Sequence, residues 1–301
     1  MTTKDTSIDA RDWSLLGLLS ILWGGSFFFN GVVLRELPPF TVVLLRVTLA
    51  ALMLLPLLWL YRVRFPTGLS GWKPFIAIGL FNNVLPFSLI VVGQTFIPSG
   101  LASILNATTP LFTVVVMTVA GEEKLRARRI AGVIVGLIGV TILHGDGLGL
   151  ERGQGLGILL CLAAAFSYGL SALVARRLPS DVPPLGAATF QMLASAAMMI
   201  VVAGAVEHPW RLPMPGAATW LAVIGLAALS TALAYIVFFQ ILRRSGATNV
   251  MLVTLLIPVT AILLGYLVLG EKISLREIAG ALVIGSALLL IDGRVLKFLQ
   301  R

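Results

Sequence analysis

The chain has 301 residues, of which 58% are hydrophobic and 12% are charged, and its mean hydropathy is +1.00. Because about a quarter of the residues in a soluble domain are charged, this composition excludes a soluble globular domain and predicts a membrane protein. The formal net charge of +9 does not indicate a nucleic-acid partner, because the basic residues are concentrated in alternate loops.

Apolar segments long enough to cross a bilayer run along the whole chain. A helix of about 20 apolar residues spans the membrane, and the chain lacks the alternating pattern of barrel strands. We therefore expect an all-α integral membrane protein with ten transmembrane helices. In chain order they cover roughly residues 14–34, 39–61, 73–95, 99–120, 127–144, 154–175, 184–205, 215–241, 246–269 and 275–292. The first span is too long for a signal sequence, so we expect no cleaved signal peptide.

The two halves of the chain share a repeated pattern. Several first-half residues and motifs recur in the same order in the second half. The corresponding pairs are Ser26 and Ser167, Arg46 and Gln191, Ile78-Gly79-Leu80 and Ile224-Gly225-Leu226, Glu123-Lys124 and Glu271-Lys272, Arg128 and Arg276, and Ile130-Ala131-Gly132 and Ile278-Ala279-Gly280. Five spans in each repeat invert the second repeat relative to the first, as in transporters that work by alternating access. We expect a cytoplasmic tail over residues 1–13, a first five-helix repeat over 14–146, a second, inverted five-helix repeat over 147–292, and a second cytoplasmic tail over 293–301.

The distribution of positive charge predicts the orientation. Of the 22 Lys and Arg residues, 16 lie on the side that holds both termini, 5 lie on the opposite side, and Arg46 lies within a span. The positive-inside rule therefore places both termini in the cytoplasm. The expected location is the bacterial inner (plasma) membrane.

Several motifs carry a resemblance to a known family. They are Leu22-Trp23-Gly24-Gly25-Ser26 in the first span, Arg46 in the second, and the segments Pro110 to Glu123 and Pro258 to Glu271 that end the fourth and ninth spans. Together with the two repeats, they resemble the EamA-type transporters of the drug/metabolite transporter superfamily over about residues 14–292. Within that superfamily the sequence most resembles the YddG-like exporters, and this resemblance implies aromatic and other neutral amino acids as substrates. The resemblance also implies a central cavity lined by spans 1, 3, 4, 6, 8 and 9.

Arg46 is the one charged residue well inside a predicted span. A charge in hydrocarbon is costly and usually marks a pathway, so the guanidinium is a candidate to bind a substrate carboxylate. The alternatives are a long side chain that reaches the membrane surface, or a structural pair with helix-end carbonyls or with Glu36.

Amides and aromatic rings are the other candidates at mid-membrane depth. Asparagine and glutamine can bind the ammonium and carboxylate groups of an amino acid, or they can join helices with hydrogen bonds of about 0.6 kcal/mol each. Aromatic rings can attract an ammonium group, although most rings in such a chain face lipid. The expected cavity-lining residues are Trp23, Ser26, Arg46, Asn82, Asn83, Gln94, Asn106, Ser167, Tyr168, Gln191 and Tyr235. Pro110 and Pro258 are expected to let the fourth and ninth spans bend at equivalent points.

The residue inventory argues against several activities. All 13 acidic residues fall in loops or at span ends, so no mid-membrane carboxylate is placed for a proton relay. The sequence shows no intramembrane catalytic motif, no metal-binding motif and no Walker-type loop, so we expect neither an enzyme nor a cofactor nor ATP-driven transport. Cys161 is the only cysteine and cannot form an intramolecular disulfide.

We therefore expect an exporter of small amphipathic metabolites, with amino acids favoured, that works by facilitated alternating access. Its partners are the substrate and the lipid bilayer, and a monomer fits the sequence. Two alternatives remain open. Efflux of lipophilic drugs usually calls for a buried carboxylate as a counter-charge, and a channel or membrane scaffold belongs to a different functional class.

Overall fold

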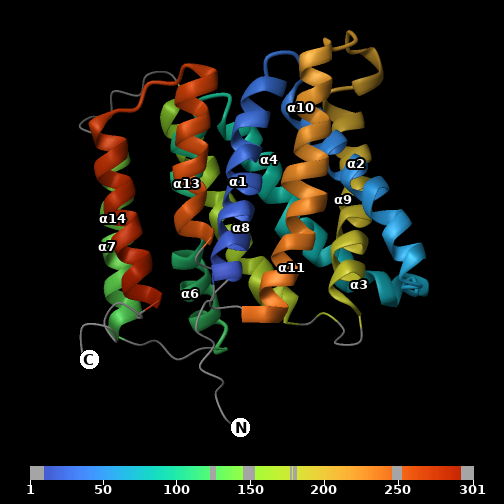
Figure 1. Ribbon diagram of the computed structural model, residues 1–301, viewed down its shortest axis with the longest axis horizontal. Coiled ribbons are helices and arrows are strands. Elements are labelled where there is room, and N and C mark those ends of the chain that lie inside the picture. The colour runs from blue at the N-terminus through green and yellow to red at the C-terminus, as the bar shows by residue number, and fades with distance from the viewer. Residues whose placement is uncertain are drawn as a thin grey trace.

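The computed structural model describes residues 10–122, 127–144, 153–176, 178, 182–245 and 253–292. Every regular element in these ranges is a helix, and they contain no strand. The helices stand side by side with their axes roughly parallel (Figure 1). This arrangement confirms the expected all-α class.

The first half of the chain contains the helices up to residue 144, and the second half contains those from residue 154. The first-half elements are α1 (Ala10–Val33), α2 (Pro39–Leu60), α3 (Gly68–Gly79), η1 (Leu80–Val84), α4 (Leu85–Gly93), α5 (Ser99–Asn106), α6 (Thr109–Val119) and α7 (Ala127–His144). The second-half elements are α8 (Gln154–Ala175), α9 (Pro184–Val206), η2 (Pro209–Arg211), α10 (Ala217–Ala227), η3 (Ala228–Leu233), α11 (Ala234–Ser245), α13 (Val253–Leu264), η4 (Gly265–Leu269) and α14 (Leu275–Asp292). We call the end of the bundle at which α1 begins the near end and the end at which α1 finishes the far end; they are the lower and upper ends in Figure 1.

The described helices include seven that are long and apolar enough to cross a membrane. They are Ala10–Val33, Pro39–Leu60, Gly68–Gly93, Ser99–Val119, Gln154–Ala175, Pro184–Val206 and Ala217–Ile241. Shorter apolar helices cover Ile130–Ile142 and Val253–Leu269. Helix α14 covers the expected tenth span but carries Arg276, Glu277 and Asp292. The chain is a multi-pass membrane protein, and the total of ten spans stays a prediction.

Helices from the two halves pack against one another rather than forming two separate bundles. The most extensive contacts pair α2 with α9, α1 with α13, α4 with α8 and α7 with α14, and each pair joins the two halves. Two large clusters of buried apolar side chains result, one centred on α1, α5, α8 and α13 and the other on α2, α4, α9 and α10. Tyr168 packs against both clusters. Its helix α8 therefore lies where the two clusters meet.

The expected third and eighth spans each contain a π-turn. Turn η1 lies between α3 and α4, and η3 lies between α10 and α11. Both lie at or just after the repeated Ile-Gly-Leu motif that ends at Leu80 and Leu226. A π-turn inserts an additional residue into a helix and often occurs at a functional site. The repeat therefore places a matched pair of π-turns in the middle of the bundle.

The two prolines singled out in the sequence have different surroundings. The fourth expected span is interrupted after Asn106, and Pro110 lies in the first turn of α6, where its missing N–H leaves no intrahelical bond unmade. Pro258 lies inside α13. Their role as bending points during transport stays a prediction.

Helices α7 and α14 approach closely at Gly139. A Cβ atom added to Gly139 would lie 2.7 Å from Ile284 Cγ1, 3.1 Å from Ile284 N and 3.2 Å from Gly280 O. Two of these atoms belong to the backbone and cannot rotate away. Glycine is therefore required here for the two helices to pack.

We expect Gly139→Ala to destabilise the protein by about 1–3 kcal/mol, because the added methyl group overpacks the contact. The matched control is Gly285→Ala on α14, where nothing lies within 4 Å of an added Cβ. Unfolding of the two purified variants in detergent measures the difference. Equal unfolding free energies would contradict the close approach.

Candidate functional site

Asn82, in π-turn η1, lies at the centre of a hydrogen-bonded network between the two halves. Its Nδ2 donates to Gln191 Oε1 at 3.1 Å and to the Tyr235 hydroxyl at 3.0 Å. Its Oδ1 accepts a hydrogen bond from Ser171 Oγ at 3.2 Å. One asparagine thus connects α8, α9 and α11.

The neighbouring Asn83 extends the same network. Its Nδ2 donates to Ser195 Oγ at 3.0 Å, and its Oδ1 accepts from the Tyr235 hydroxyl at 3.2 Å. Asn82 and Asn83 are consecutive residues of π-turn η1, and both therefore bind the same tyrosine, Tyr235. Ser167 Oγ donates to the carbonyl of Phe81 at 2.8 Å, immediately before Asn82. We call Asn82, Asn83, Ser167, Ser171, Gln191, Ser195 and Tyr235 the amide network.

Arg46 lies beside this network on α2. Its Nε donates to Thr231 Oγ1 at 3.0 Å, and its guanidinium carbon lies 3.7 Å from the centroid of the Phe87 ring. The residue is only 6% exposed. The phenol groups of Tyr168 and Tyr235 also lie near the guanidinium.

No carboxylate among the described residues forms an ion pair with Arg46. The pair with Glu36 that the sequence left open does not form in the structure, because Glu36 Oε2 instead accepts a hydrogen bond from the Gly216 N–H at 2.7 Å. The Arg46 side chain is held inside the bundle by a hydroxyl and an aromatic ring. Its positive charge is therefore without a protein counter-charge in the part of the chain that the structure describes.

Arg46 and Gln191 occupy corresponding positions in the sequence repeat, and the structure gives them corresponding contacts. Arg46 on α2 binds Thr231 in η3, and Gln191 on α9 binds Asn82 in η1. Each side chain thus reaches the π-turn of the other half. The central site is approximately two-fold symmetric in its contacts and asymmetric in its charge.

The remaining predicted residues lie outside this network. Gln94 Nε2 donates to Phe27 O at 3.0 Å and to Ser99 Oγ at 3.1 Å, and its Oε1 accepts from Asn30 at 2.8 Å. These contacts form a second polar cluster near the far end, where α4 finishes and α5 begins.

In α1, Ser26 Oγ donates to the Trp23 carbonyl at 2.6 Å, and the Trp23 ring packs 5.5 Å from that of Phe238. Asn106, at the break between α5 and α6, has a buried Oδ1 without a hydrogen-bond partner. No hydrogen bond in the described residues joins Trp23, Ser26, Gln94 or Asn106 to the amide network.

Four residues with contacts at this site, Phe87, Ser171, Ser195 and Thr231, were not predicted from the sequence. Two of these have a detectable signal, since Ser171 follows Ser167 and Ser195 follows Gln191 by four residues, which places each pair on one helix face. Thr231 has no such signal, because the π-turn that contains it shifts the helical register.

Three glutamates at the far end join the halves through helix N-termini. Glu207 accepts hydrogen bonds from Phe40 N at 2.9 Å, Thr41 N at 2.6 Å and Thr41 Oγ1 at 2.8 Å, at the start of α2. Glu36 binds the start of α10 through Gly216. Carboxylates suit these positions because helix N-termini carry unpaired N–H groups and partial positive charge.

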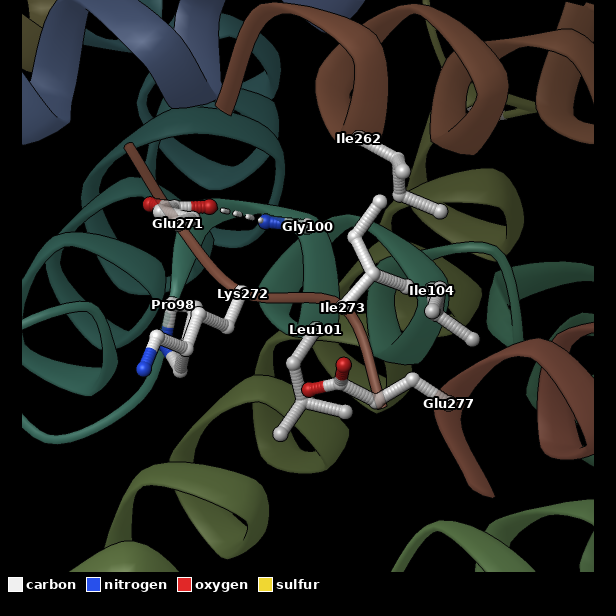
Figure 2. A pocket seen from close by; sticks show the side chains of 9 residues that line it. All are labelled: Pro98, Gly100, Leu101, Ile104, Ile262, Glu271, Lys272, Ile273 and Glu277. Carbon is white, nitrogen blue, oxygen red and sulfur yellow. Dashed lines mark hydrogen bonds between the residues drawn. The ribbon is translucent and has the colours of Figure 1, made fainter. Parts of the chain in front are cut away.

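Glu271 makes the third contact of this kind. Its carboxylate accepts from Ser99 N at 2.8 Å and Gly100 N at 3.2 Å, at the start of α5. Figure 2 shows this carboxylate beside the pocket formed by Pro98, Gly100, Leu101, Ile104, Ile262, Glu271, Lys272, Ile273 and Glu277. No residue of the amide network lines that pocket. We call the contacts of Glu36, Glu207 and Glu271 the far-end contacts.

The near end is also bridged between the halves. Arg244 Nε lies 3.0 Å from Asp12 Oδ1, and Arg176 Nη1 lies 2.9 Å from Glu122 Oε2. The amide network and Arg46 thus lie between two sets of polar contacts, one at each end of the bundle.

A family model for EamA-like transporters matches residues 12–144 and again residues 155–292. The chain belongs to the EamA-like transporter family. The double match agrees with the internal repeat, and it makes the chain a membrane transporter.

Several bacterial transporters resemble this chain along most of its length. An uncharacterized transporter YoaV of Bacillus subtilis is 25% identical over 90% of this chain and 93% of its own. A protein of Salmonella typhimurium named "Probable amino-acid metabolite efflux pump" is 27% identical over 92% of this chain and 93% of its own. The uncharacterized inner membrane transporter YedA of Escherichia coli is 27% identical over 86% of this chain and 83% of its own.

A solved crystal structure has the same fold. It covers 95% of this chain and 99% of its own with a TM-score of 0.66 at 21% sequence identity. At this identity the likeness concerns the EamA fold alone. The overall arrangement of the helix bundle is therefore shared with that structure.

Proposed function

We propose that this EamA-family transporter exports small neutral amino acids, aromatic ones included, across the bacterial inner membrane. The observation that carries the proposal is Arg46, a buried guanidinium beside the amide network that lacks a carboxylate partner among the described residues. A charge in the membrane interior is costly, and such a residue generally faces a binding site or pathway. The name of the Salmonella relative, an amino-acid metabolite efflux pump, agrees with this substrate class.

The polar groups of the site match the two ends of an amino acid. A guanidinium can bind a carboxylate through two parallel N–H···O bonds. On the other side, the side-chain oxygens of Asn82, Asn83 and Gln191 and the Tyr235 hydroxyl are acceptors for an ammonium group. These acceptors already receive hydrogen bonds from the donors of the network, namely Asn82 Nδ2, Ser171 Oγ and the Tyr235 hydroxyl. Substrate would therefore replace existing hydrogen bonds rather than fill an apolar space. Tyr168 and Trp23 are proposed to contact the substrate side chain.

Alternating access is the proposed mechanism. We propose ten spans in two inverted repeats with both termini in the cytoplasm, so that the far end faces the outside. The far-end contacts and the near-end ion pairs each join the halves. Release of one set while the other holds would open the central site to one side at a time.

We propose facilitated transport, without obligatory proton exchange and without an enzymatic step. The acidic side chains that the structure describes lie at or near the ends of helices, as Glu36, Glu207 and Glu271 illustrate. No carboxylate belongs to the amide network. The amide network therefore offers no carboxylate to relay protons, and the gradient of the substrate itself is the proposed driving force.

Counterflow in proteoliposomes tests the proposal. We expect labelled phenylalanine, threonine and methionine to accumulate when the same unlabelled amino acid is present on the trans side, with or without a pH gradient. Accumulation that requires the pH gradient would overturn the facilitated mechanism. No flux of any of the three would overturn the amino-acid assignment and favour efflux of drugs or other metabolites.

A further inference from the structure

Thr231 connects Arg46 to the backbone of the other half. It lies in π-turn η3 and is fully buried. Its hydroxyl donates to the carbonyl of Leu226 at 2.9 Å, five residues earlier, and accepts from Arg46 Nε at 3.0 Å. A hydroxyl has a single proton, and that proton is used toward Leu226. Its oxygen is therefore fixed as an acceptor that faces Arg46.

The Phe87 ring fixes the guanidinium in the other direction. The guanidinium carbon lies 3.7 Å from the ring centroid, which is a favourable distance for cation–π contact. With Nε held by Thr231 and one face on Phe87, the group has little freedom to rotate. Only the edge that carries the two Nη atoms remains to bind a ligand.

That remaining edge has no hydrogen-bond partner among the described residues and is not completely buried. Neither Nη atom donates to a described residue in the structure, and neither is among the fully buried polar atoms without a partner. The small exposed fraction of Arg46 therefore includes these atoms. A carboxylate that binds Arg46 must bind it end-on, through both Nη atoms, because Thr231 occupies Nε.

We propose that Thr231 is a positioning residue that holds Arg46 end-on for the substrate carboxylate and thereby selects substrates with a free carboxylate. This inference rests on the proposed function and deepens it. Arg46 lies nearer the far end of α2, whereas Gln191 lies nearer the near end of α9. A zwitterion is therefore bound in one orientation, with its carboxylate toward the far end.

The test compares two substrates of nearly the same shape, phenylalanine and phenylalaninamide, which lacks the carboxylate. In Thr231→Val we expect the KM for phenylalanine counterflow to rise about tenfold, since a hydrogen bond to a charged group is lost. The KM for phenylalaninamide is expected to be higher than that for phenylalanine in the wild type, and to stay within twofold of its own wild-type value in Thr231→Val. Thr231→Ser keeps the hydroxyl and should restore the wild-type KM for phenylalanine.

Thr189→Val is the matched control. Thr189 is also a fully buried threonine, but its hydroxyl binds only the Leu185 carbonyl of its own helix. This variant should leave both KM values unchanged. Equal KM shifts for the two substrates in Thr231→Val, or no shift for either, would overturn the positioning role.

Substrate-induced thermal stabilisation of the purified protein in detergent separates this inference from the transport assignment. At a phenylalanine concentration close to the wild-type KM, we expect the Tm of the wild type and of Thr231→Ser to rise, and that of Thr231→Val to rise far less, because its binding is about tenfold weaker. If wild-type protein is stabilised in this pattern but shows no counterflow, the positioning role holds and the export function fails. If phenylalanine neither moves nor stabilises the wild type, both are overturned.

Discussion

Arg46→Gln is expected to lower amino-acid counterflow about 100-fold or more. Removing one partner of a buried, hydrogen-bonded charge pair generally costs 2–5 kcal/mol or more, and roughly 1.4 kcal/mol corresponds to a factor of ten. Glutamine is an informative replacement because Gln191 occupies the corresponding position of the other repeat. The variant makes the two sides of the site chemically alike and removes their charge difference.

Arg46→Lys is expected to retain part of the activity, with a loss of about tenfold. Lysine keeps the positive charge but has neither the planar fork for a carboxylate nor an Nε–H to donate to Thr231. The proteoliposome counterflow assay measures both variants. The control is Arg35→Gln, since Arg35 is an exposed arginine in the loop after α1.

Stability measurements distinguish a site role from a structural role for Arg46. The cost of desolvating a buried charge is only partly offset by one hydroxyl and one ring, so replacement by a neutral side chain should not destabilise the fold. We expect the Tm of Arg46→Gln in detergent to equal or exceed that of the wild type. A large fall in Tm together with lost counterflow would assign Arg46 to packing instead.

The length of the apolar segments predicts most of this fold, because lipid constrains the backbone strongly. A segment such as Pro39–Leu60 is apolar apart from Thr41, Arg46 and Thr48, and in a bilayer it satisfies its backbone hydrogen bonds only as a helix. Its length and the loop after it follow from composition. The repeat further indicates which helices correspond, as for Arg46 and Gln191.

The contacts between helices are less accessible to sequence reasoning. Asn82, Asn83, Gln191 and Tyr235 were predicted as lining residues, and the structure joins them in one network. Gln94 has the same amide chemistry but lies at the end of α4, where it binds Ser99 at the far end. Residue type alone does not distinguish these two environments, because the neighbouring helices decide which groups meet.

Thr231 shows why the π-turns matter for prediction. A regular helix has 3.6 residues per turn, and its faces can be assigned by counting. Turn η3 adds a residue to that count, so positions after Leu226 no longer fall on the face that the periodicity assigns. The partner of Arg46 therefore emerges only from the structure.

Glu207→Ala is expected to open the far end and to lower counterflow. Glu207 accepts three hydrogen bonds at the start of α2, the helix that carries Arg46, and it reaches them from the other half. Charge-assisted bonds of this kind contribute about 1.5–3 kcal/mol each when buried and less when partly exposed. A loss of about 1.4 kcal/mol shifts the equilibrium between closed and open far ends tenfold.

The accessibility of Leu37 measures this opening. Leu37 is buried in the loop before α2, so Leu37→Cys in a Cys161→Ala background should react slowly with a membrane-impermeant maleimide. Adding Glu207→Ala should raise the labelling rate about tenfold, in line with the population shift. Labelling from outside intact cells also tests the orientation, because it requires that the far end is extracellular.

Glu277→Ala is the matched control for Glu207→Ala, because it removes a glutamate that binds a helix N-terminus within one half. Glu277 Oε2 accepts from Ser274 N at 2.8 Å, and Ser274 Oγ accepts from Glu277 N at 3.1 Å, which forms a capping box at the start of α14. If bridging the halves is what closes the far end, only Glu207→Ala accelerates labelling of the cysteine at position 37. Equal acceleration by both substitutions would show that general loosening of helix ends, rather than a contact between the halves, controls access to the site.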